Sequence, residues 1–318
     1  MAKIIEDRQG RIRGAMMVIV VQGYFADQVV PFAWISSGVV DEEARAMGAG
    51  AGLYCWVYQS FPLVGAMSGN QNSRPINAAL GLDIPGVAME RFIAVHRPQT
   101  AELCPAPYRD ALAAAIARWP SARPSRLRTV LSAALPDDYE ELWQRARRRF
   151  VCCVERDAAH MAWRYTAAPH VTYQFLAMRS GSALTALAVL RFQPTPAGAV
   201  CRVVDFIADD HGAQEAWSAV RETTREAGAL CVDFMMIGTD QTEALRRSGF
   251  QQAGADAALT AIPHLLSPVE HRQWSNTFHL GGKLAKADQR WRHAHAVYFT
   301  KGDSDRDWPT TFDLEGSR

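Results

Sequence analysis

The chain has 318 residues, and at roughly 100–200 residues per domain this length predicts about two domains. Its formal net charge of +1 argues against a nucleic-acid-binding face, which would need an excess of Lys and Arg. No stretch approaches the ~18 apolar residues of a membrane span, and the six cysteines form no C-x-x-C pair. We therefore expect a cytoplasmic protein without a membrane span or disulfides.

Residues 1–100 predict a series of strands interrupted by two helices. Residues 3–6 and 11–22 form an expected hairpin around the turn Asp7–Gly10. Residues 28–40 are a third extended segment, rich in Val, Ile, Phe and Trp. The elements expected next are a helix to about residue 60, a strand at 62–68, a short helix at 73–80 and a strand at 89–96.

Frequent prolines then change the composition. They bracket an Ala-rich helix at residues 108–119 and disfavour one continuous element (Pro98, Pro105, Pro107, Pro120, Pro124 and Pro136). We therefore predict a first unit at residues 1–100, a linker with one helix at 101–136, and a second unit at 137–318.

The element order of the first unit recurs in the second. A helix at 138–150, with Asp137 as the expected N-cap, precedes three strands at 172–179, 184–192 and 201–208. A helix at 214–227, a strand at 229–237 and a short helix ending at 248–250 follow. The halves share little residue identity, so the repeat lies in element order alone.

The segment 39–51 carries the clearest chemical signal. A strand ends there, a turn with Gly48 and Gly50 follows, and a helix begins. Backbone N–H groups at the positive end of a helix can bind a phosphate, and a glycine lets the phosphate approach the backbone closely. Taken alone, such a turn also fits a flexible loop or a tightly packed helix start. Neither the P-loop pattern nor G-x-G-x-x-G is complete here.

In this context Arg45-x-x-Gly48-x-Gly50 resembles the [R/Q]-x-x-G-x-[G/A] signature of the GNAT acetyltransferase superfamily. Asn70, after the next strand, and the helix end at 79–82 resemble that family's "N…LGF" segment, with Leu in place of Phe. The resemblance implies an α/β (α+β) fold of two fused GNAT-like units. Each unit would be a mixed, mostly antiparallel twisted sheet flanked by helices.

The resemblance also implies a cofactor, acetyl-CoA or another acyl-CoA, and a role for each matching residue. Val39 and Val40 would offer backbone groups to the pantetheine arm, and Asn70 would steady it from the other side. The pyrophosphate would be held by seven backbone N–H groups: Arg45, Ala46, Met47, Gly48, Ala49, Gly50 and Ala51. An acceptor amine or hydroxyl would attack the thioester while backbone donors stabilise the oxyanion.

Three features depart from the family pattern. Asn77 stands where many members have the Tyr that protonates the thiolate, and a carboxamide is no acid. The expected hairpin starts almost at residue 1, which leaves no room for the family's first strand and two helices. In the second unit, Asp209 and Asp210 occupy the phosphate turn and would repel a pyrophosphate. We therefore expect a cofactor-free second unit that covers the acceptor wall, with the active cleft at the junction.

Segments of the second unit resemble GNAT-like proteins of bacterial cell-surface polysaccharide pathways: an aromatic strand from Tyr173, 163–165, 203–206, 248–250 and 301–305. Trp163–Tyr165 would either stack against a sugar ring or close a core edge. His293 and His295, two imidazoles on one face of an expected strand, lack a third ligand, so we expect no metal. Asp303-x-Asp305-x-Asp307 lacks the Gly and Glu of a calcium loop and is expected to be a solvated turn.

The leading hypothesis is an acyl-CoA-dependent N- or O-acyltransferase that acts on a small amine or sugar-like acceptor. A catalytically inactive binding or assembly protein of the same fold is the first alternative, and an aminoacyl-tRNA-dependent transferase is the second. The general base stays open among several side chains: Asp41, Glu42, Glu43, His160, His170 and Asp205.

Overall fold

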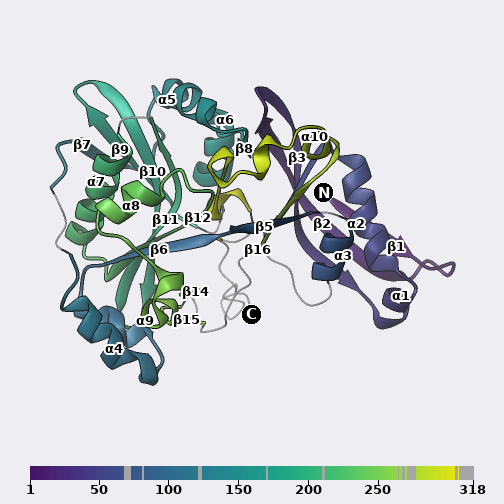
Figure 1. The fold of residues 1–318 in the computed structure, drawn as a ribbon, viewed down its shortest axis with the longest axis horizontal. Helices are drawn as coiled ribbons and strands as arrows, with labels where there is room; N and C mark the ends of the chain where they lie inside the picture. The colour runs from purple at the N-terminus through teal and green to yellow at the C-terminus, as the bar shows by residue number, and fades with distance from the viewer. Residues whose placement is uncertain are drawn as a thin grey trace.

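The computed structural model describes residues 1–67, 73–80, 82–120, 124–169, 171–209, 212–263, 265–266, 269–270, 277–304 and 307. Two lobes are visible in Figure 1, one built mainly from early residues (purple and blue) and one mainly from later residues (teal and green). We call them the N-terminal half and the C-terminal half. No helix in the described ranges is long and apolar enough to cross a membrane.

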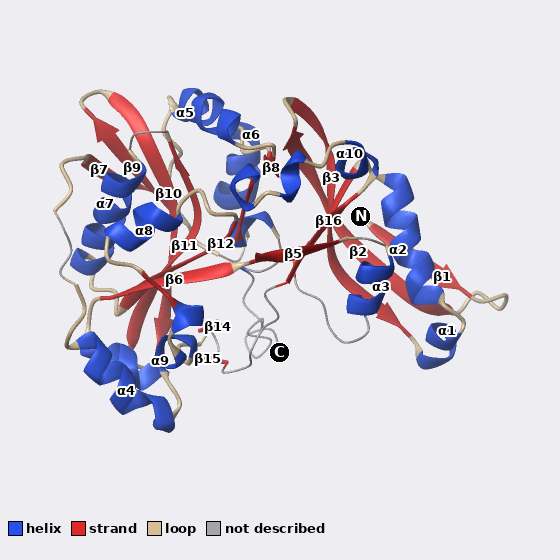
Figure 2. Cartoon of the chain, in the orientation of Figure 1, coloured by secondary structure: helices blue, strands red, loops and turns tan. Residues whose placement is uncertain are grey.

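The N-terminal half begins with an antiparallel meander, β1 (Ala2–Glu6), β2 (Ile12–Phe25) and β3 (Gln28–Val40). Two helices follow, α1 (Glu42–Ala46) and α2 (Ala49–Ser60), and then β4 (Leu63–Met67), α3 (Ser73–Ala79) and β5 (Asp83–Ala88). Because side chains alternate along a strand, β2 sends Met16 and Val18 to one face, where they pack with Leu53 and Val57 of α2. Figure 2 shows α2 and α3 beside each other next to β2 and β3.

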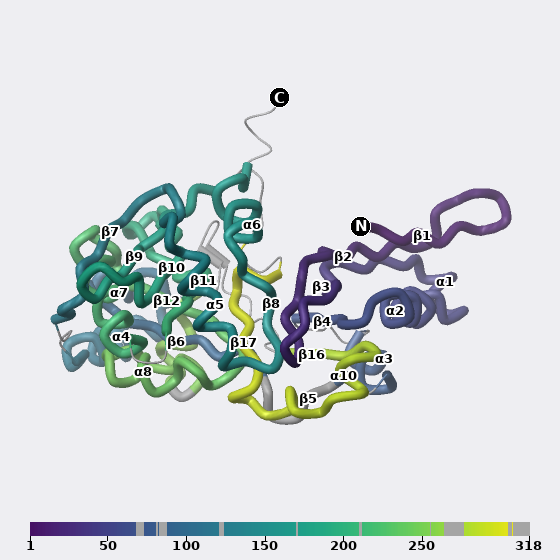
Figure 3. Tube along the Cα trace, turned by 90° about the horizontal axis from the view of Figure 1, so that it is seen from above, coloured from purple at the N-terminus to yellow at the C-terminus, as the bar shows by residue number. Residues whose placement is uncertain are grey.

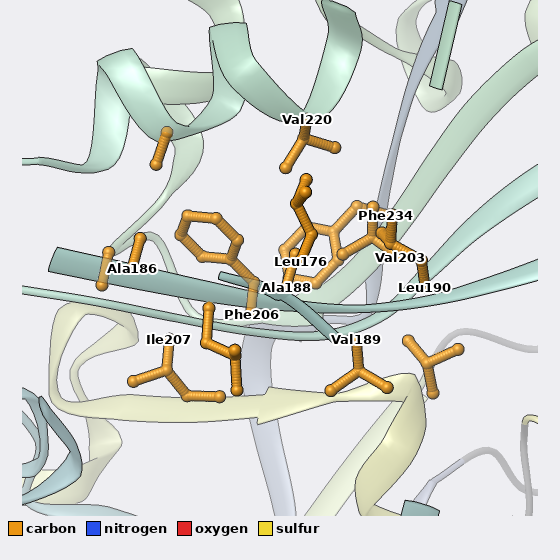
Figure 4. Close-up of a cluster of buried hydrophobic side chains, with 14 of the residues drawn as sticks. Leu176, Ala186, Ala188, Val189, Leu190, Val203, Phe206, Ile207, Val220 and Phe234 are labelled. Atoms are coloured by element: carbon orange, nitrogen blue, oxygen red, sulfur yellow. The ribbon is translucent and has the colours of Figure 1, made fainter. Parts of the chain in front are cut away.

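The C-terminal half repeats this order. Its strands β9 (Gln174–Ser180), β10 (Ala183–Thr195) and β11 (Gly198–Ala208) form a second antiparallel meander, followed by α7 (Ala213–Glu226), β12 (Cys231–Ile237) and α8 (Thr242–Arg247). In Figure 4, Phe206 lies on the side of Val220 of α7, whereas Val189 and Ile207 lie on the opposite face. The rings of Phe206 and Trp217 stack with centroids 4.0 Å apart.

The two halves exchange strands. β6 (Glu90–Val95), from the predicted first unit, pairs with β12 and with β13 (Gln251–Gln252). In return, β16 (Thr277–Gly281) lies between β4 and β5, and Figure 1 shows it in yellow within the purple lobe. The boundaries at residues 100 and 137 stay a prediction about units, but strand pairing crosses them in both directions.

Two short strands join the sheets. β8 (Cys152–Val154) pairs with β2 and, in parallel, with β17 (Val297–Thr300), and β17 pairs with β12. The result is one mixed, mostly antiparallel sheet that runs through both halves. In Figure 3, β8 and β17 lie side by side between the lobes.

Several local predictions are wrong. Asp138, not Asp137, is the N-cap of α5 (Tyr139–Ala146), and its carboxylate accepts two hydrogen bonds from Arg179. The predicted linker contains α4 (Ala106–Ile116) as expected, but also a strand, β7 (Arg128–Ser132), which pairs with β9. The other α-helices and strands of the described residues are α6 (Ala158–Met161), α9 (Ala257–Thr260), β14 (Leu265–Leu266), β15 (Val269–Glu270) and α10 (Lys283–Ala287).

The histidine pair is also placed differently from its prediction. His293 is the N-cap of a 3₁₀ turn at Ala294–Ala296 and His295 lies within that turn, so neither is on a strand, and their rings stack with centroids 5.6 Å apart. Within the described part of the chain, no group of His, Cys, Asp and Glu side chains is arranged to hold a metal ion.

Candidate functional site

A left-handed glycine connects the two helices that follow β3. Asp41 caps α1, since its Oδ1 accepts the Ala44 N–H at 2.8 Å. Gly48 has φ +82° and is the N-cap of α2. A side chain is strained at this φ, so the glycine allows the abrupt change of direction from α1 into α2.

The first turn of α2 presents unpaired backbone donors. The Gly52 N–H is the first to bond within the helix, to the Gly48 carbonyl at 3.1 Å. The amides of Ala49, Gly50 and Ala51 precede it and have no acceptor among the described residues. Three such donors at the positive end of a twelve-residue helix form a site suited to an anion.

The strands beside this turn diverge. β3 and β4 pair in parallel from Phe32–Leu63 to Ile35–Ala66, after which β3 continues to Val40. Beyond Ile35, its described partner is β2 alone. The register with β2 shifts there, which leaves Ser36 as the extra residue of a β-bulge. Among the described residues this edge of β3 has no strand partner beyond Ile35, and the side chain of Val39 is 72% exposed.

Helix α3 lies against the same turn. A Cβ built on Gly50 would be 3.9 Å from Ile76 Cδ1. The neighbouring Asn77 is 1% exposed, and neither atom of its carboxamide has a hydrogen-bond partner. Leaving a buried polar group unpaired costs about 1–3 kcal/mol, so this side chain calls for an explanation. It occupies the position that the resemblance gives to the acid.

The structure gathers most of the predicted cofactor residues at one end of the N-terminal sheet. Val39 and Val40 end β3, and the segment 45–51 follows them directly. The Arg45 and Gly48 amides donate to the Asp41 and Arg45 carbonyls, at 2.9 and 3.0 Å, and the Met47 amide also donates to the Arg45 carbonyl. Of the predicted pyrophosphate donors, the amides of 49–51 are those at the start of α2 that have no acceptor among the described residues. Ala46, the last residue of α1, and Met47, on the connecting turn, are exposed. Asn70 and His170 lie outside the described residues.

The equivalent strands of the C-terminal half diverge too, but another strand fills the space. β11 and β12 pair from Cys201–Val232 to Val203–Phe234. β6 pairs along the edge of β12 that faces away from β11. β17 pairs with Met236 and Ile237 of β12 and therefore lies on the same edge of β12 as β11, in the space where β11 diverges. There the Tyr298 hydroxyl donates to the Phe206 carbonyl at 2.5 Å.

A buried ion-pair cluster anchors this filling segment. Arg156, fully buried, donates through Nε to both oxygens of Asp205 (3.2 and 2.9 Å) and through Nη2 to Asp303 Oδ2 (2.5 Å). The prediction that Asp303 lies in a solvated turn is therefore wrong, because Arg156 draws its carboxylate into the core, where it is 4% exposed. Burial raises the pKa of Asp303 to about 7, although Arg156 opposes the shift.

A cavity of about 270 Å³ lies where the halves meet. It is lined by Ile19 and Val21 of β2 and by two segments of the C-terminal half: His160, Trp163, Arg164, Ala167, Ala168, Pro169, Gly302, Asp303 and Ser304. Neither His160 Nε2 nor Asp303 Oδ1 has a hydrogen-bond partner. Burial lowers the pKa of His160 to about 3, and Arg156 and Arg164 add to this shift, so the imidazole is neutral at pH 7.

The cavity adjoins the diverging strands of the N-terminal half. Ser304 Oγ lies 3.2 Å from the sulfur of Met67, the last residue of β4. Ile19 pairs with Trp34, one residue before the end of the β3–β4 pairing. Sequence analysis placed the cleft at the junction but missed the β2 residues that line it, because apolar strand residues carry no chemical signal.

No protein-family model and no curated protein matches the chain. Among solved structures, a GCN5-related N-acetyltransferase from Anabaena variabilis ATCC 29413 is similar, with a TM-score of 0.57 at 13% identity over 88% of this chain and 62% of that one. A conserved protein of unknown function from Enterococcus faecalis V583, titled a probable N-acyltransferase, gives a TM-score of 0.54 at 9% identity over 86% and 59%. This chain thus spans about three-fifths of their length. The predicted α/β fold class is confirmed.

Proposed function

From the fold of the GCN5-related N-acetyltransferases, which this chain has, we propose that it is an acyl-CoA-dependent N- or O-acyltransferase with one cofactor site, in the N-terminal half. The observation that carries the proposal is the set of three free amides, Ala49 to Ala51, at the head of α2 beside the diverging β3 and β4. Acetyl-CoA or another acyl-CoA is the cofactor that fits this site, and when bound it would supply an activated thioester.

The residues present suggest a role for each part of the site. The α2 amides hold the pyrophosphate, as backbone donors at a helix start hold phosphates elsewhere. The β3 edge from Ser37 to Val40 accepts the pantetheine arm as an added strand would be accepted. Backbone donors of β3 beyond its bulge would stabilise an oxyanion, and Asn70 stays the predicted contact on the other side.

The junction cavity is the proposed acceptor site. It lies beside the ends of β3 and β4, and both halves line it. A small amine or a sugar-like hydroxyl held there would face the acyl group. The C-terminal half then acts as a cofactor-free second unit that supplies one wall, which agrees with the filling of its own strand divergence by β17.

Asn77 favours a second candidate function, that of an inactive binding or assembly protein. Its carboxamide is no proton donor to a thiolate, although water could take that role. A protein of this kind would bind acyl-CoA without turnover, or would not bind it at all.

Thermal melting with acetyl-CoA tests the proposal. Ligand at about 100 times its dissociation constant stabilises the folded state by about 2.7 kcal/mol, which raises the melting temperature. Gly50→Glu adds a carboxylate beside the free amides and should abolish this rise. Gly52→Glu is the matched control, because the Gly52 amide is already bonded and a Cβ there meets no atom within 4 Å.

Wild type and the control should both respond to acetyl-CoA, and Gly50→Glu should not. No response to acetyl-CoA or to longer acyl-CoAs would overturn the proposed site. Release of free CoA thiol with an added acceptor distinguishes the enzyme from the binding protein, since the latter would show the rise in melting temperature without the thiol.

A further inference from the structure

Trp163 is an exposed aromatic side chain in the wall of the junction cavity. It is 53% exposed, whereas Trp34, Trp143, Trp217 and Trp291 are each at most 1% exposed. An indole is among the largest apolar surfaces that a residue offers, and folding usually buries most of it. An uncovered ring beside a cavity therefore marks a place where a ligand would remove apolar surface from water.

A π-helical turn at Ala162–Thr166 presents this ring. The Ala167 N–H donates to the Ala162 carbonyl, five residues before it, at 2.9 Å. Turns of this kind are rare in helices and occur frequently at functional sites. Trp163 follows the first residue of the turn, and its ring lies 5.6 Å from that of His160, which also lines the cavity.

The two residues after Trp163 anchor the turn. Arg164 donates to the carbonyls of Gly302 (2.7 Å) and Ser304 (3.0 Å), which lie in the segment after β17. The Tyr165 hydroxyl donates to the buried carboxylate of Asp205 at 3.1 Å. The turn is thus held at two points before any ligand binds, so a ring that packs against the indole meets a wall that is already in place.

The polar side chains of the lining offer a ligand little in comparison. His160 Nε2 and Asp303 Oδ1 have no hydrogen-bond partner, but both atoms are buried and out of reach. Arg164 already donates to two carbonyls, and Ser304 Oγ donates to the sulfur of Met67 at 3.2 Å. A ligand with hydroxyls on every side would therefore lose its water without gaining equivalent partners from these side chains.

We propose that Trp163 determines acceptor specificity, and that the acceptor carries a flat apolar ring that packs against the Trp163 indole in the junction cavity. The inference rests on the proposed function, because it names the acceptor class of the same site. It concerns the body of the acceptor, whether the reacting group is an amine or a hydroxyl. Aromatic pairs are stabilised beyond the area that they bury, and Ile19 and Val21 add aliphatic surface to the same cavity from β2.

Binding measured without acyl-CoA tests this inference separately from the cofactor site. The calorimetric probes are 2-phenylethanol, 2-cyclohexylethanol, which has the same carbon skeleton without the flat ring, and methyl glucoside. Wild type should bind the flat ring roughly two- to tenfold more tightly than the saturated ring, the range that aromatic pairing adds beyond buried area. Methyl glucoside should bind more weakly than both.

Variants of Trp163 place this preference on one side chain. Trp163→Ala should remove it, and Trp163→Phe should keep it, because a phenyl ring also pairs with a flat ring. Tyr108→Ala is the matched control, since Tyr108 is 40% exposed on α4 and does not line the cavity, and it should leave the three affinities unchanged.

Equal affinities for the two rings, no binding of either, or tighter binding of methyl glucoside would overturn the inference. So would a preference that survives in a folded Trp163→Ala protein. If that variant does not fold, the wild-type comparison of the three probes decides. Gly50→Glu should lose acetyl-CoA binding and keep the ring preference. Acetyl-CoA binding by a wild type without ring preference would reject this inference alone, whereas ring preference without acetyl-CoA binding would reject the proposed function and keep Trp163 as a ligand-binding residue.

Discussion

The molecule contains two parallel strand pairs that diverge, β3–β4 and β11–β12, and a further strand fills the space between the strands of the second pair. Beyond Ile35, β3 has β2 as its one strand partner among the described residues, and a left-handed glycine leads to three amides without a described acceptor. Between β11 and β12 the space holds β17, and the glycine before α7, Gly212, has an ordinary φ of −101°. The same architecture thus leaves the site of the proposed cofactor groove in one half and uses its counterpart as a seam that joins the sheets.

Truncating the side chain that fills the seam should have the largest effect. Tyr298 is 2% exposed and stacks on Phe150 with centroids 4.9 Å apart. Tyr298→Ala should lower the free energy of unfolding by about 3–5 kcal/mol, because it leaves a cavity in a tightly packed seam. Val39→Ala, on the open β3 edge, should change it by less than about 0.5 kcal/mol. Denaturant titration measures both, and similar losses would mean that the two divergences do not differ.

The second-largest effect should be a difference between Gly48 and Gly212 in the stability that an alanine substitution costs. Gly48→Ala places a side chain at φ +82° and should cost about 1–2 kcal/mol through backbone strain alone, because no atom lies within 4 Å of the added Cβ. Gly212→Ala has no strain of this kind. Its nearest neighbour would be Asp209 Oδ1 at 3.3 Å, the end of a flexible side chain, so the cost should be smaller. A larger loss at Gly212 would contradict the contrast between the turns.

The smallest expected effect concerns the junction wall and depends on pH. His160 has a folded-state pKa of about 3, below its ordinary 6.5, so the unfolded chain binds the proton more readily between these values. Its contribution to stability is present above about pH 6.5 and is lost as the pH falls towards 3. At pH 5.5 the loss relative to pH 7.5 should be about 1 kcal/mol, and His160→Gln should remove it. Parallel stability–pH curves for wild type and variant would show that His160 is not held neutral.

The sequence alone predicted the features of this comparison that depend on neighbouring residues, namely strand β3 and the glycine turn after it. The bounds of β3, residues 28–40, agree with the structure because β-branched and aromatic residues fill a run bounded by turns. The glycine turn was recognisable because Gly48 and Gly50 follow a strand and precede a helix. The cofactor bound beside this turn and the role of Asn70 stay predictions.

The sequence analysis did not predict the pairing of strands that are far apart in the chain. β6 and β16 each lie beside the parallel strand of the other half, and strand composition does not specify which free edge a strand joins. Asp303 seemed solvated because its neighbours in sequence are polar, but its partner Arg156 is remote in the chain. The fold class and element order follow from local patterns, whereas the exchange and the seam depend on contacts that no local pattern encodes.

Calorimetric titration of acetyl-CoA tests the central claim most directly, because it counts the sites. We expect one acetyl-CoA per chain in wild type and in Gly52→Glu, and none in Gly50→Glu. Two sites per chain, no binding by wild type, or binding that survives Gly50→Glu would contradict a single cofactor groove at the head of α2.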